Sequence, residues 1–434
     1  MTRPDGLPAK TDVVVIGAGV IGLSVAFALR KEGRDVVVLD RGRAGGGASH
    51  GNCGTLTPSH ALPLAQPGVI SKALKWMIRR DAPLYVQPRF DPALWAWLLK
   101  FAGRCNEASV RQVGAAKARL LIDSRVRLRD WIRNEQFACE FEERGQLAVY
   151  RDDRTFTAHQ ANADLLREFG IRIEARSGAE ARRMSPGLRA DVVAGHFYPG
   201  DAEIRPDRYV AELLAAARSL GVTVLENTAV DGFVQEQTRI TGVRVEAHEI
   251  GAKQVVLASG VLAPQLAGKL GIKLPIQPGK GYSVTFTAPK RAPALPLVLR
   301  ERAVCVTPWA SGFRLGSTME FSGLSERLNP IRIAALKRGA AEYLEEPCGP
   351  VELEQWYGFR PMTFDDLPII GPAPRHEGLW LAAGHGMLGM SLSAGSRYRI
   401  GSTDQSSPPS TPKMRSRDMN MLQMSANRPI AMTT

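Results

Sequence analysis

The chain has 434 residues, of which 44% are hydrophobic, 23% charged and 7% aromatic. This composition is ordinary for a folded protein and excludes a mostly disordered, collagenous or coiled-coil chain. The formal net charge is +13, but no binding motif accompanies the scattered basic residues, so we expect no nucleic-acid partner. The five cysteines form no CxxC or Cys/His cluster, which argues against a metal site and favours the reducing cytosol.

Residues 12–41 predict a βαβ unit. An apolar, β-branched run at 13–16 is typical of a strand buried on both faces, residues 20–32 of a helix, and residues 35–39 of a second strand. The glycines in the apolar stretch 13–29, and its length, argue against a membrane-spanning helix, which needs roughly 20 residues. We therefore predict neither a spanning segment nor an export signal.

The turn of this unit matches the dinucleotide-binding pattern GxGxxG. Gly17 permits a tight turn, Gly19 lets the backbone approach a pyrophosphate, and Gly22 lets helix and strand pack closely. Asp40, at the end of the second strand, is placed to accept a hydrogen bond from a ribose hydroxyl and disfavours NADP. The motif alone does not distinguish NAD from FAD.

The rest of the chain interrupts the βαβ pattern instead of repeating it. After a glycine-rich loop at 42–57 and irregular structure with helices at 62–106, we predict further elements at intervals. The predicted helices are 110–137 and 206–220, the strands are 146–150, 222–225, 253–258, 276–287, 304–316 and 379–383, and the segment 358–371 is a turn-rich loop.

This discontinuous arrangement resembles the FAD-dependent amine-oxidising family that includes D-amino acid oxidase, glycine oxidase and sarcosine oxidase. The resemblance covers residues 12–395, and the closest likeness is to bacterial D-amino acid dehydrogenases, including the D-hydroxyproline type. The motifs that carry it are GGGASHGNCGTL at 45–56, VVLASG at 255–260, PGKGYSV at 278–284, GFRPMTFDDLPIIG at 358–371 and GHGMLG at 384–389.

The resemblance implies an α/β fold (α+β overall) with two domains. A discontinuous Rossmann-like FAD-binding domain would comprise residues 11–60, 150–275 and 356–395, and an antiparallel-sheet substrate domain residues 61–149 and 276–355. The implied reaction is hydride transfer from the α-carbon of a D-amino acid or cyclic imino acid, such as D-proline or hydroxyproline, to flavin N5. Electrons would pass to a quinone or respiratory-chain acceptor.

By resemblance, sixteen positions would lie at or shape the FAD site. They are Gly17, Gly19, Val20, Gly22, Asp40, Arg41, Ser49, Asn52, Gly54, Val230, Gly260, Gly384, His385, Gly386, Met387 and Gly389. Glycine oxidases carry an arginine where this chain has Met387, so a second carboxylate-binding cation is not evident and a less polar pocket is expected.

Three residues are the predicted catalytic group. Arg360 corresponds to the arginine of the family motif, and a forked guanidinium suits a substrate carboxylate; a surface role or an ion pair with a neighbouring aspartate is the alternative. Tyr282 is expected to hydrogen-bond the carboxylate or close the pocket, although a tyrosine buried elsewhere fits as well. His50, like His385, is a candidate acceptor for a proton of the substrate ammonium.

Two segments outside these motifs leave alternatives open. The basic and aromatic residues of 72–97 suit contact with the inner face of the plasma membrane, although tryptophans packed in the core beside solvated charges are the preferred explanation. In residues 396–434 the family's apolar helix gives way to a Ser-, Thr-, Pro- and Met-rich tail, which predicts disorder or a frameshift after Gly395. The rival functions are a glycine- or sarcosine-type oxidase using oxygen, and a non-catalytic flavoprotein with a defective C-terminus.

Overall fold

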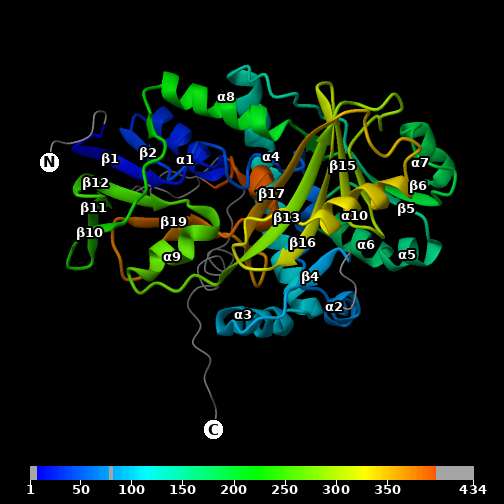
Figure 1. Cartoon of the computed structure of the whole chain (residues 1–434), viewed down its shortest axis with the longest axis horizontal. Coiled ribbons are helices and arrows are strands. Elements are labelled where there is room, and N and C mark those ends of the chain that lie inside the picture. The colour runs from blue at the N-terminus through cyan, green and yellow to red at the C-terminus, as the bar shows by residue number, and fades with distance from the viewer. Residues whose placement is uncertain (1–6, 78–81, 397–434) are drawn as a thin grey trace, which may run out of the picture.

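The computed structural model describes residues 7–77 and 82–396 and contains two large β-sheets surrounded by helices (Figure 1). One sheet is mostly parallel and the other mostly antiparallel, so the predicted mixed α/β architecture is confirmed. Among the described residues, no helix is long and apolar enough to cross a bilayer. The predicted tail, apart from Ser396, lies outside the described residues, and its disorder or frameshift stays a prediction.

The first sheet has β1 at its centre, with β2 and β12 paired to it in parallel. Its valines, Val13 to Val15, are fully buried because helices and a second layer cover both faces. The strand order is β10-β11-β12-β1-β2-β9, with β19 on β12 and β18 on β19. The bounds are β1 Lys10–Ile16, β2 Val36–Leu39, β9 Thr223–Leu225, β10 Gly232–Glu236, β11 Arg239–Val245, β12 His248–Leu257, β18 Ile369–Pro372 and β19 Leu379–Ala383.

The second sheet is built around the long strand β13, which pairs antiparallel with β16 and β17. Its order is β17-β13-β16-β15-β14-β5-β7-β6, and β4 adds to β16. The bounds are β4 Leu84–Val86, β5 Gln146–Tyr150, β6 Glu174–Ser177, β7 Ala194–Tyr198, β13 Ile276–Phe286, β14 Leu297–Leu299, β15 Val304–Trp309, β16 Gly312–Phe321 and β17 Glu352–Thr363. A separate small ladder joins β3 (Thr55–Leu56) to β8 (Ala202–Glu203).

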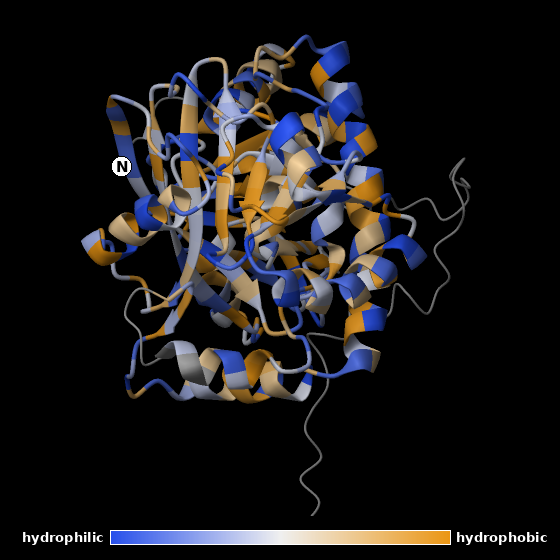
Figure 2. Ribbon diagram, turned by 90° about the vertical axis from the view of Figure 1, so that its right-hand side faces the viewer, coloured by the Kyte–Doolittle hydropathy of each residue, from blue (hydrophilic) through white to orange (hydrophobic). Residues whose placement is uncertain are grey.

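Helices cover the outer faces of the sheets. Figure 2 shows hydrophobic residues gathered in the inner strands, whereas the outer helices alternate hydrophobic and hydrophilic positions. The helix α4 begins at Asn106, whose side chain accepts a hydrogen bond from Ser109 N. The α-helices are α1 Val20–Lys31, α2 Val69–Met77, α3 Pro92–Gly103, α4 Glu107–Asn134, α5 Asp153–Ala158, α6 Gln160–Glu168, α7 Gly178–Met184, α8 Pro206–Ser219, α9 Ala263–Gly268, α10 Pro330–Ala341 and α11 Gly389–Leu392; short 3₁₀ turns are η1 Pro58–Ala61, η2 Gly260–Leu262 and η3 Gly386–Leu388.

The structure corrects one predicted loop. Residues 358–363, assigned to a turn-rich segment because of Gly358 and Pro361, belong to β17. This strand lies at the edge of its sheet and pairs only with β13, and an edge strand tolerates proline because its free side needs no N–H donor. The predicted strand at 304–316 is likewise two strands, β15 and β16, joined by a tight turn.

The chain crosses between the sheets more often than the predicted division allows. The segment 150–275 was assigned to the FAD-binding domain, yet its strands β6 and β7 pair into the second sheet. The strand β17, at the start of the predicted segment 356–395, also belongs to the second sheet. Sheet membership therefore does not follow the predicted boundaries at 150 and 356.

Candidate active site

A cavity of about 1420 Å³ extends from the β1–α1 turn to the inner face of the second sheet. Pockets for one small ligand typically measure roughly 300–1,000 Å³. This cavity is therefore large enough for a dinucleotide together with a small substrate. It is lined both by the glycine-rich turns of the first sheet and by charged side chains of the second.

At one end of the cavity lies the turn between β1 and α1. Gly17 has φ +109°, and a Cβ added there would lie 2.6 Å from the carbonyl oxygen of Ala258, so only glycine fits. Gly19 precedes α1 without a side-chain cap, and Val20 N donates to Ser49 Oγ at 3.0 Å. Apart from the amide of Val20, the first turn of the helix presents its N–H groups and the positive end of its dipole, which suits a diphosphate.

Asp40 lies next to this turn, at the end of β2, and lines the cavity with Arg41 and Val230. Its Oδ2 accepts a hydrogen bond from Ala18 N at 2.7 Å, and its Oδ1 accepts one from Gly42 N at 2.9 Å. Each carboxylate oxygen keeps acceptor capacity toward the cavity. The carboxylate is therefore fixed where a ribose hydroxyl of a bound dinucleotide would need an acceptor.

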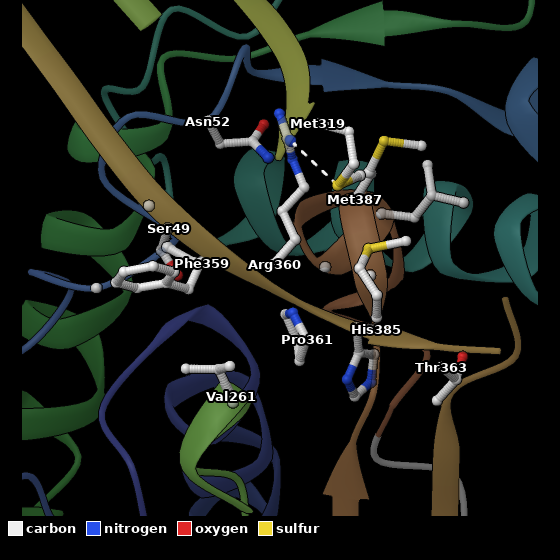
Figure 3. Close-up of a pocket in the computed structure, with 18 of the residues that line it drawn as sticks. Ser49, Asn52, Val261, Met319, Phe359, Arg360, Pro361, Thr363, His385 and Met387 are labelled. Carbon is white, nitrogen blue, oxygen red and sulfur yellow. Dashed lines mark hydrogen bonds between the residues drawn. The ribbon is translucent and has the colours of Figure 1, made fainter. Parts of the chain in front are cut away.

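The other predicted cofactor residues gather further along the cavity. Figure 3 shows Ser49, Asn52, His385 and Met387 bordering the same space as Arg360. His385 is buried, its Nε2 lies 2.8 Å from Ser396 Oγ, and burial lowers its pKa to about 3. Its imidazole is consequently neutral and a weak base at physiological pH. The remaining residues of this group that line the cavity are Gly260, Gly386 and Gly389.

Three predicted cofactor glycines lie behind the cavity wall instead of in it. A Cβ at Gly22 would lie 1.8 Å from Gly17 O, and one at Gly54 would lie 2.1 Å from Ile204 O. Gly384 has φ +73°, and its added Cβ would meet the side chain of Thr363 at 2.7 Å. These glycines shape the turns that line the cavity, and the structure does not place them against a ligand.

His50 is not among the cavity-lining residues, which corrects its assignment as a proton acceptor. Its Nε2 lies 2.7 Å from Glu354 Oε1, and this hydrogen bond raises the pKa of the imidazole. This partly exposed pair of side chains links the loop that carries His50 to β17. The position of the His50 side chain therefore does not support a role in the reaction.

Arg360 projects from β17 across β13, where a Cβ at Gly281 would lie 2.3 Å from the guanidinium. Its Nη1 donates to Thr318 O at 2.6 Å and its Nη2 to Ser317 O at 3.4 Å. Both residues that supply these carbonyls have positive φ, 137° at Ser317 and 59° at Thr318. No described carboxylate lies within 4 Å of Arg360, and Asp366 pairs with Lys117 instead. The alternative ion pair with Asp366 is thus wrong, and Asp365 makes none with Arg360 either.

Tyr282, on β13, is 1% exposed and lines the same cavity. Its hydroxyl donates to Glu320 Oε2 at 3.3 Å, and Glu320 lies 3.4 Å from Arg332 Nε. Burial and the charge of Glu320 raise the pKa of Tyr282, so the phenol keeps its proton. Because that single proton is engaged by Glu320, Tyr282 offers the cavity an acceptor lone pair and not the donor that a carboxylate needs.

The sequence did not single out several polar residues that line the cavity: Cys53, His60, His159, Arg300 and Cys305. Cys53 Sγ packs over β16, where a Cβ at Gly316 would lie 2.5 Å away. A hydrogen bond with the Cys305 thiol lowers the pKa of Cys53. The one signal that the sequence contains is alternation, which directs Arg300, the residue after β14, to the same side as Val298.

The basic and aromatic segment 72–97 is split in the structure. Trp97 is buried and its Nε1 donates to Met362 O at 3.1 Å, so this tryptophan belongs to the core. Trp95 is 51% exposed and lines the cavity together with Leu64 and Ile70, which are also partly exposed. Arg79 and Arg80 lie outside the described residues. The three exposed apolar side chains of Leu64, Ile70 and Trp95, which lie beside the exposed Lys72, are called the apolar rim of the cavity below.

Comparisons with known proteins agree with this geometry. The family described as DAO, FAD dependent oxidoreductase, matches residues 12–398. A D-amino acid dehydrogenase from Paramagnetospirillum magneticum is 35% identical over 392 residues, covering 88% of this chain and 92% of that protein. A D-amino acid dehydrogenase from Dechloromonas aromatica is 34% identical over 397 residues, covering 88% and 94%.

Solved structures share the fold at lower identity. The glycine oxidase from Geobacillus kaustophilus superposes with a TM-score of 0.71 at 21% identity, covering 92% of this chain and 97% of that one. The L-proline dehydrogenase from P. horikoshii gives a TM-score of 0.70 at 20% identity, covering 90% and 91%. At such identities these likenesses concern the fold.

Proposed function

The chain belongs to the DAO family of FAD-dependent oxidoreductases, and from that premise we propose that it is a dehydrogenase of D-amino acids. The cofactor is FAD, and the described residues fit it, since the capless helix N-terminus, Asp40 and the long cavity suit a dinucleotide. The observation that carries the proposal is Arg360, a cavity-lining cation without a carboxylate partner. A partly buried guanidinium in that state is ready for the carboxylate of an amino acid.

FAD, when bound, supplies the acceptor for the hydride that leaves the substrate α-carbon. Arg360 would hold the α-carboxylate through two parallel hydrogen bonds and so orient the α-carbon. The carbonyls of Ser317 and Thr318 hold the guanidinium in place. Binding the substrate at this cation also neutralises a charge that burial otherwise disfavours.

Tyr282 would face the amino group of the substrate. Its proton is donated to Glu320, so its oxygen is an acceptor for a substrate N–H. The substrate nitrogen must be neutral before hydride leaves, and an acceptor at this position favours the amine with its lone pair free. His385, neutral and weakly basic, contributes no comparable proton acceptor.

The electron acceptor we propose is a quinone that reaches the flavin through the apolar rim of the cavity. Leu64, Ile70 and Trp95 form this rim, and the exposed Phe90 and Leu99 lie on the chain next to Trp95. Exposed apolar side chains gathered at an opening suit an apolar acceptor and contact with a lipid surface. We place such contact at the inner face of the plasma membrane, with the protein otherwise in the cytosol.

The test is turnover of matched enantiomers with a quinone analogue or redox dye as acceptor. We expect D-amino acids, including D-proline in the panel, to reduce the acceptor at least 100-fold faster than their L-enantiomers. Peroxide release in air at the same rate as dye reduction would instead favour a glycine- or sarcosine-type oxidase. A yellow protein that no amino acid in the panel reduces would favour the non-catalytic flavoprotein.

A further inference from the structure

Arg300, like Arg360, lines the cavity without an ion pair to any described carboxylate. It follows β14, and strand alternation points it to the same face as Val298, which also lines the cavity. Its Nη2 donates to Tyr198 Oη at 3.2 Å, while its buried Nε has no partner. No described carboxylate lies within 4 Å of its guanidinium. The contrast is Lys117, a buried cation of the same region that pairs with Asp366.

The strand register places Arg300 level with the anchor of Arg360. Leu299 lies opposite Val304, and Val304 lies opposite Ser317. Both β14 and β16 run antiparallel to β15, so they run in the same direction as each other. The residue after Leu299 is Arg300, and the residue after Ser317 is Thr318. Thr318 O is the carbonyl that holds Arg360. Two strand spacings, about 10 Å, therefore separate the backbone of Arg300 from that of Thr318, and the charges of both arginines act on the Cys305 thiol of the intervening strand β15.

The surroundings of Arg300 do not neutralise it. Burial lowers the pKa of His60 to about 3, and the positive charge of Arg300 adds to the shift. Burial together with Arg300 also lowers the pKa of His159. The buried acid of this region, Asp201, is held by Ser59; burial raises its pKa to about 7, against the opposing charges of Arg125 and Arg300, and it makes no ion pair with Arg300 within 4 Å. This end of the cavity thus combines a full positive charge with neutral imidazoles, which is an environment that favours an anion.

We propose that Arg300 binds an anionic group on the substrate side chain, so that acidic D-amino acids are the preferred substrate class. This inference rests on the proposed oxidation of D-amino acids, with Arg360 on the α-carboxylate. A paired guanidinium and carboxylate place their carbon atoms about 4 Å apart. Because both arginines line one cavity, D-aspartate or D-glutamate held by its α-carboxylate at Arg360 can extend its side-chain carboxylate toward Arg300.

The inference changes the sequence-based picture of the pocket. Met387 stands where glycine oxidases have an arginine, which predicted a less polar pocket. The structure shows a second cation in the cavity, contributed by β14 and not by the GHGMLG turn. D-Proline, which has no anionic group for Arg300, is accordingly expected to be a poor substrate.

The experiment compares isosteric substrate pairs on the FAD-loaded full chain. For the wild type we expect kcat/KM for D-glutamate to exceed that for D-glutamine by about 100-fold, as for a hydrogen-bonded charge. In Arg300→Gln this ratio falls to near one, and Arg300→Lys retains part of it. Arg189→Gln, at an exposed arginine away from the cavity, keeps the wild-type ratio. The flavin absorbance of each variant shows whether it folds.

Binding provides a readout that needs no turnover. The affinities of glutarate and butyrate are measured from the change that each causes in the flavin spectrum. In the wild type we expect glutarate to bind at least 10-fold more tightly than butyrate, and in Arg300→Gln we expect equal affinities. The inference is overturned if D-glutamine matches D-glutamate, or if glutarate and butyrate bind alike. Absence of reduction by every D-amino acid would refute the proposed function itself, whereas oxidation without an acidic preference refutes only the role of Arg300.

Discussion

Two arginines that line this cavity differ from the buried Arg314 in their ion pairing. Arg360 and Arg300 are partly buried and line the cavity without a carboxylate partner among the described residues, whereas the fully buried Arg314 lies 3.6 Å from Glu354 and donates to the carbonyls of His50 and Asn52. A buried cation that the protein does not pair is expensive unless a ligand completes it. Arg360 and Arg300, which have no carboxylate partner among the described residues, are therefore the side chains that we expect to contact the ligand.

Replacing Arg360 by lysine tests the carboxylate clamp. Lysine keeps the charge but loses the planar fork, so we expect kcat/KM for the best D-amino acid to fall about 100-fold, a loss of roughly 2–3 kcal/mol. The measurement is dye-coupled kinetics with flavin content determined in parallel. Arg111→Lys, on the outside of α4, is the matched control and should leave kcat/KM unchanged. An unaltered kcat/KM in Arg360→Lys would remove this residue from the substrate site.

Site residues could be predicted from the sequence where they belong to a motif. They could not be predicted where their position depends on the register between strands. Arg360 and Tyr282 were found because a family motif contains each, and the structure places both in the cavity wall. Arg300 was missed because its position depends on the pairing of β14 with β15, two segments that nothing local relates. His50 was misplaced because proximity in sequence to a flavin-type loop does not fix the direction of a side chain.

Among the elements, the β1–α1 turn decides whether FAD can bind. A matched pair of glycines tests it, because Gly17 and Gly33 both have positive φ but differ in space. Gly17→Ala would drive a Cβ to within 2.6 Å of Ala258 O, whereas nothing lies within 4 Å of a Cβ at Gly33. We expect Gly17→Ala to abolish FAD retention on purification and Gly33→Ala to keep it, at a cost of about 1 kcal/mol in unfolding free energy.

The ratio of flavin to protein absorbance measures this directly. Retention of stoichiometric FAD by Gly17→Ala would show that the turn tolerates the side chain and that the diphosphate lies elsewhere. Equal loss of FAD in both variants would indicate that general destabilisation, and not the approach of the cofactor, is responsible.

Element prediction succeeded for segments whose burial is uniform. The strands 146–150 and 379–383 have the predicted bounds, because each is a short apolar run buried in its sheet. The segment 358–363 failed because glycine and proline signal turns, although an edge strand admits both. The pairing partner of a strand cannot be predicted from its own residues. The position of β6 and β7 in the second sheet was therefore not predicted.

For the whole molecule, buried histidines predict a loss of stability in acid. Burial lowers the pKa of His60 and His385 to about 3 and that of His196 to about 4. These imidazoles stay neutral in the folded state but take up protons on unfolding below about pH 6.5. Stability that is present above that pH is consequently lost as pH falls toward 3–4. Burial raises the pKa of Asp201 to about 7, so this carboxyl group releases its proton on unfolding in the same pH range. It therefore offsets the proton uptake of one histidine.

We therefore expect the free energy of unfolding to fall by roughly 2–3 kcal/mol per pH unit between pH 6 and 4.5. Urea titrations at a series of pH values measure this slope. His60→Asn removes one of the three groups and should reduce the slope by about 1.4 kcal/mol per pH unit. A stability that is constant or rises over this range would contradict the neutral, buried state of these side chains.

The central claim, that the cavity between the two sheets holds FAD and a D-amino acid bound at Arg360, is tested most directly by anaerobic mixing. Purified full-length protein is expected to be yellow, and excess D-glutamate is expected to bleach its flavin band completely while L-glutamate leaves it unchanged. A colourless protein that does not bind added FAD, or a flavin band that no D-amino acid bleaches, would contradict the account.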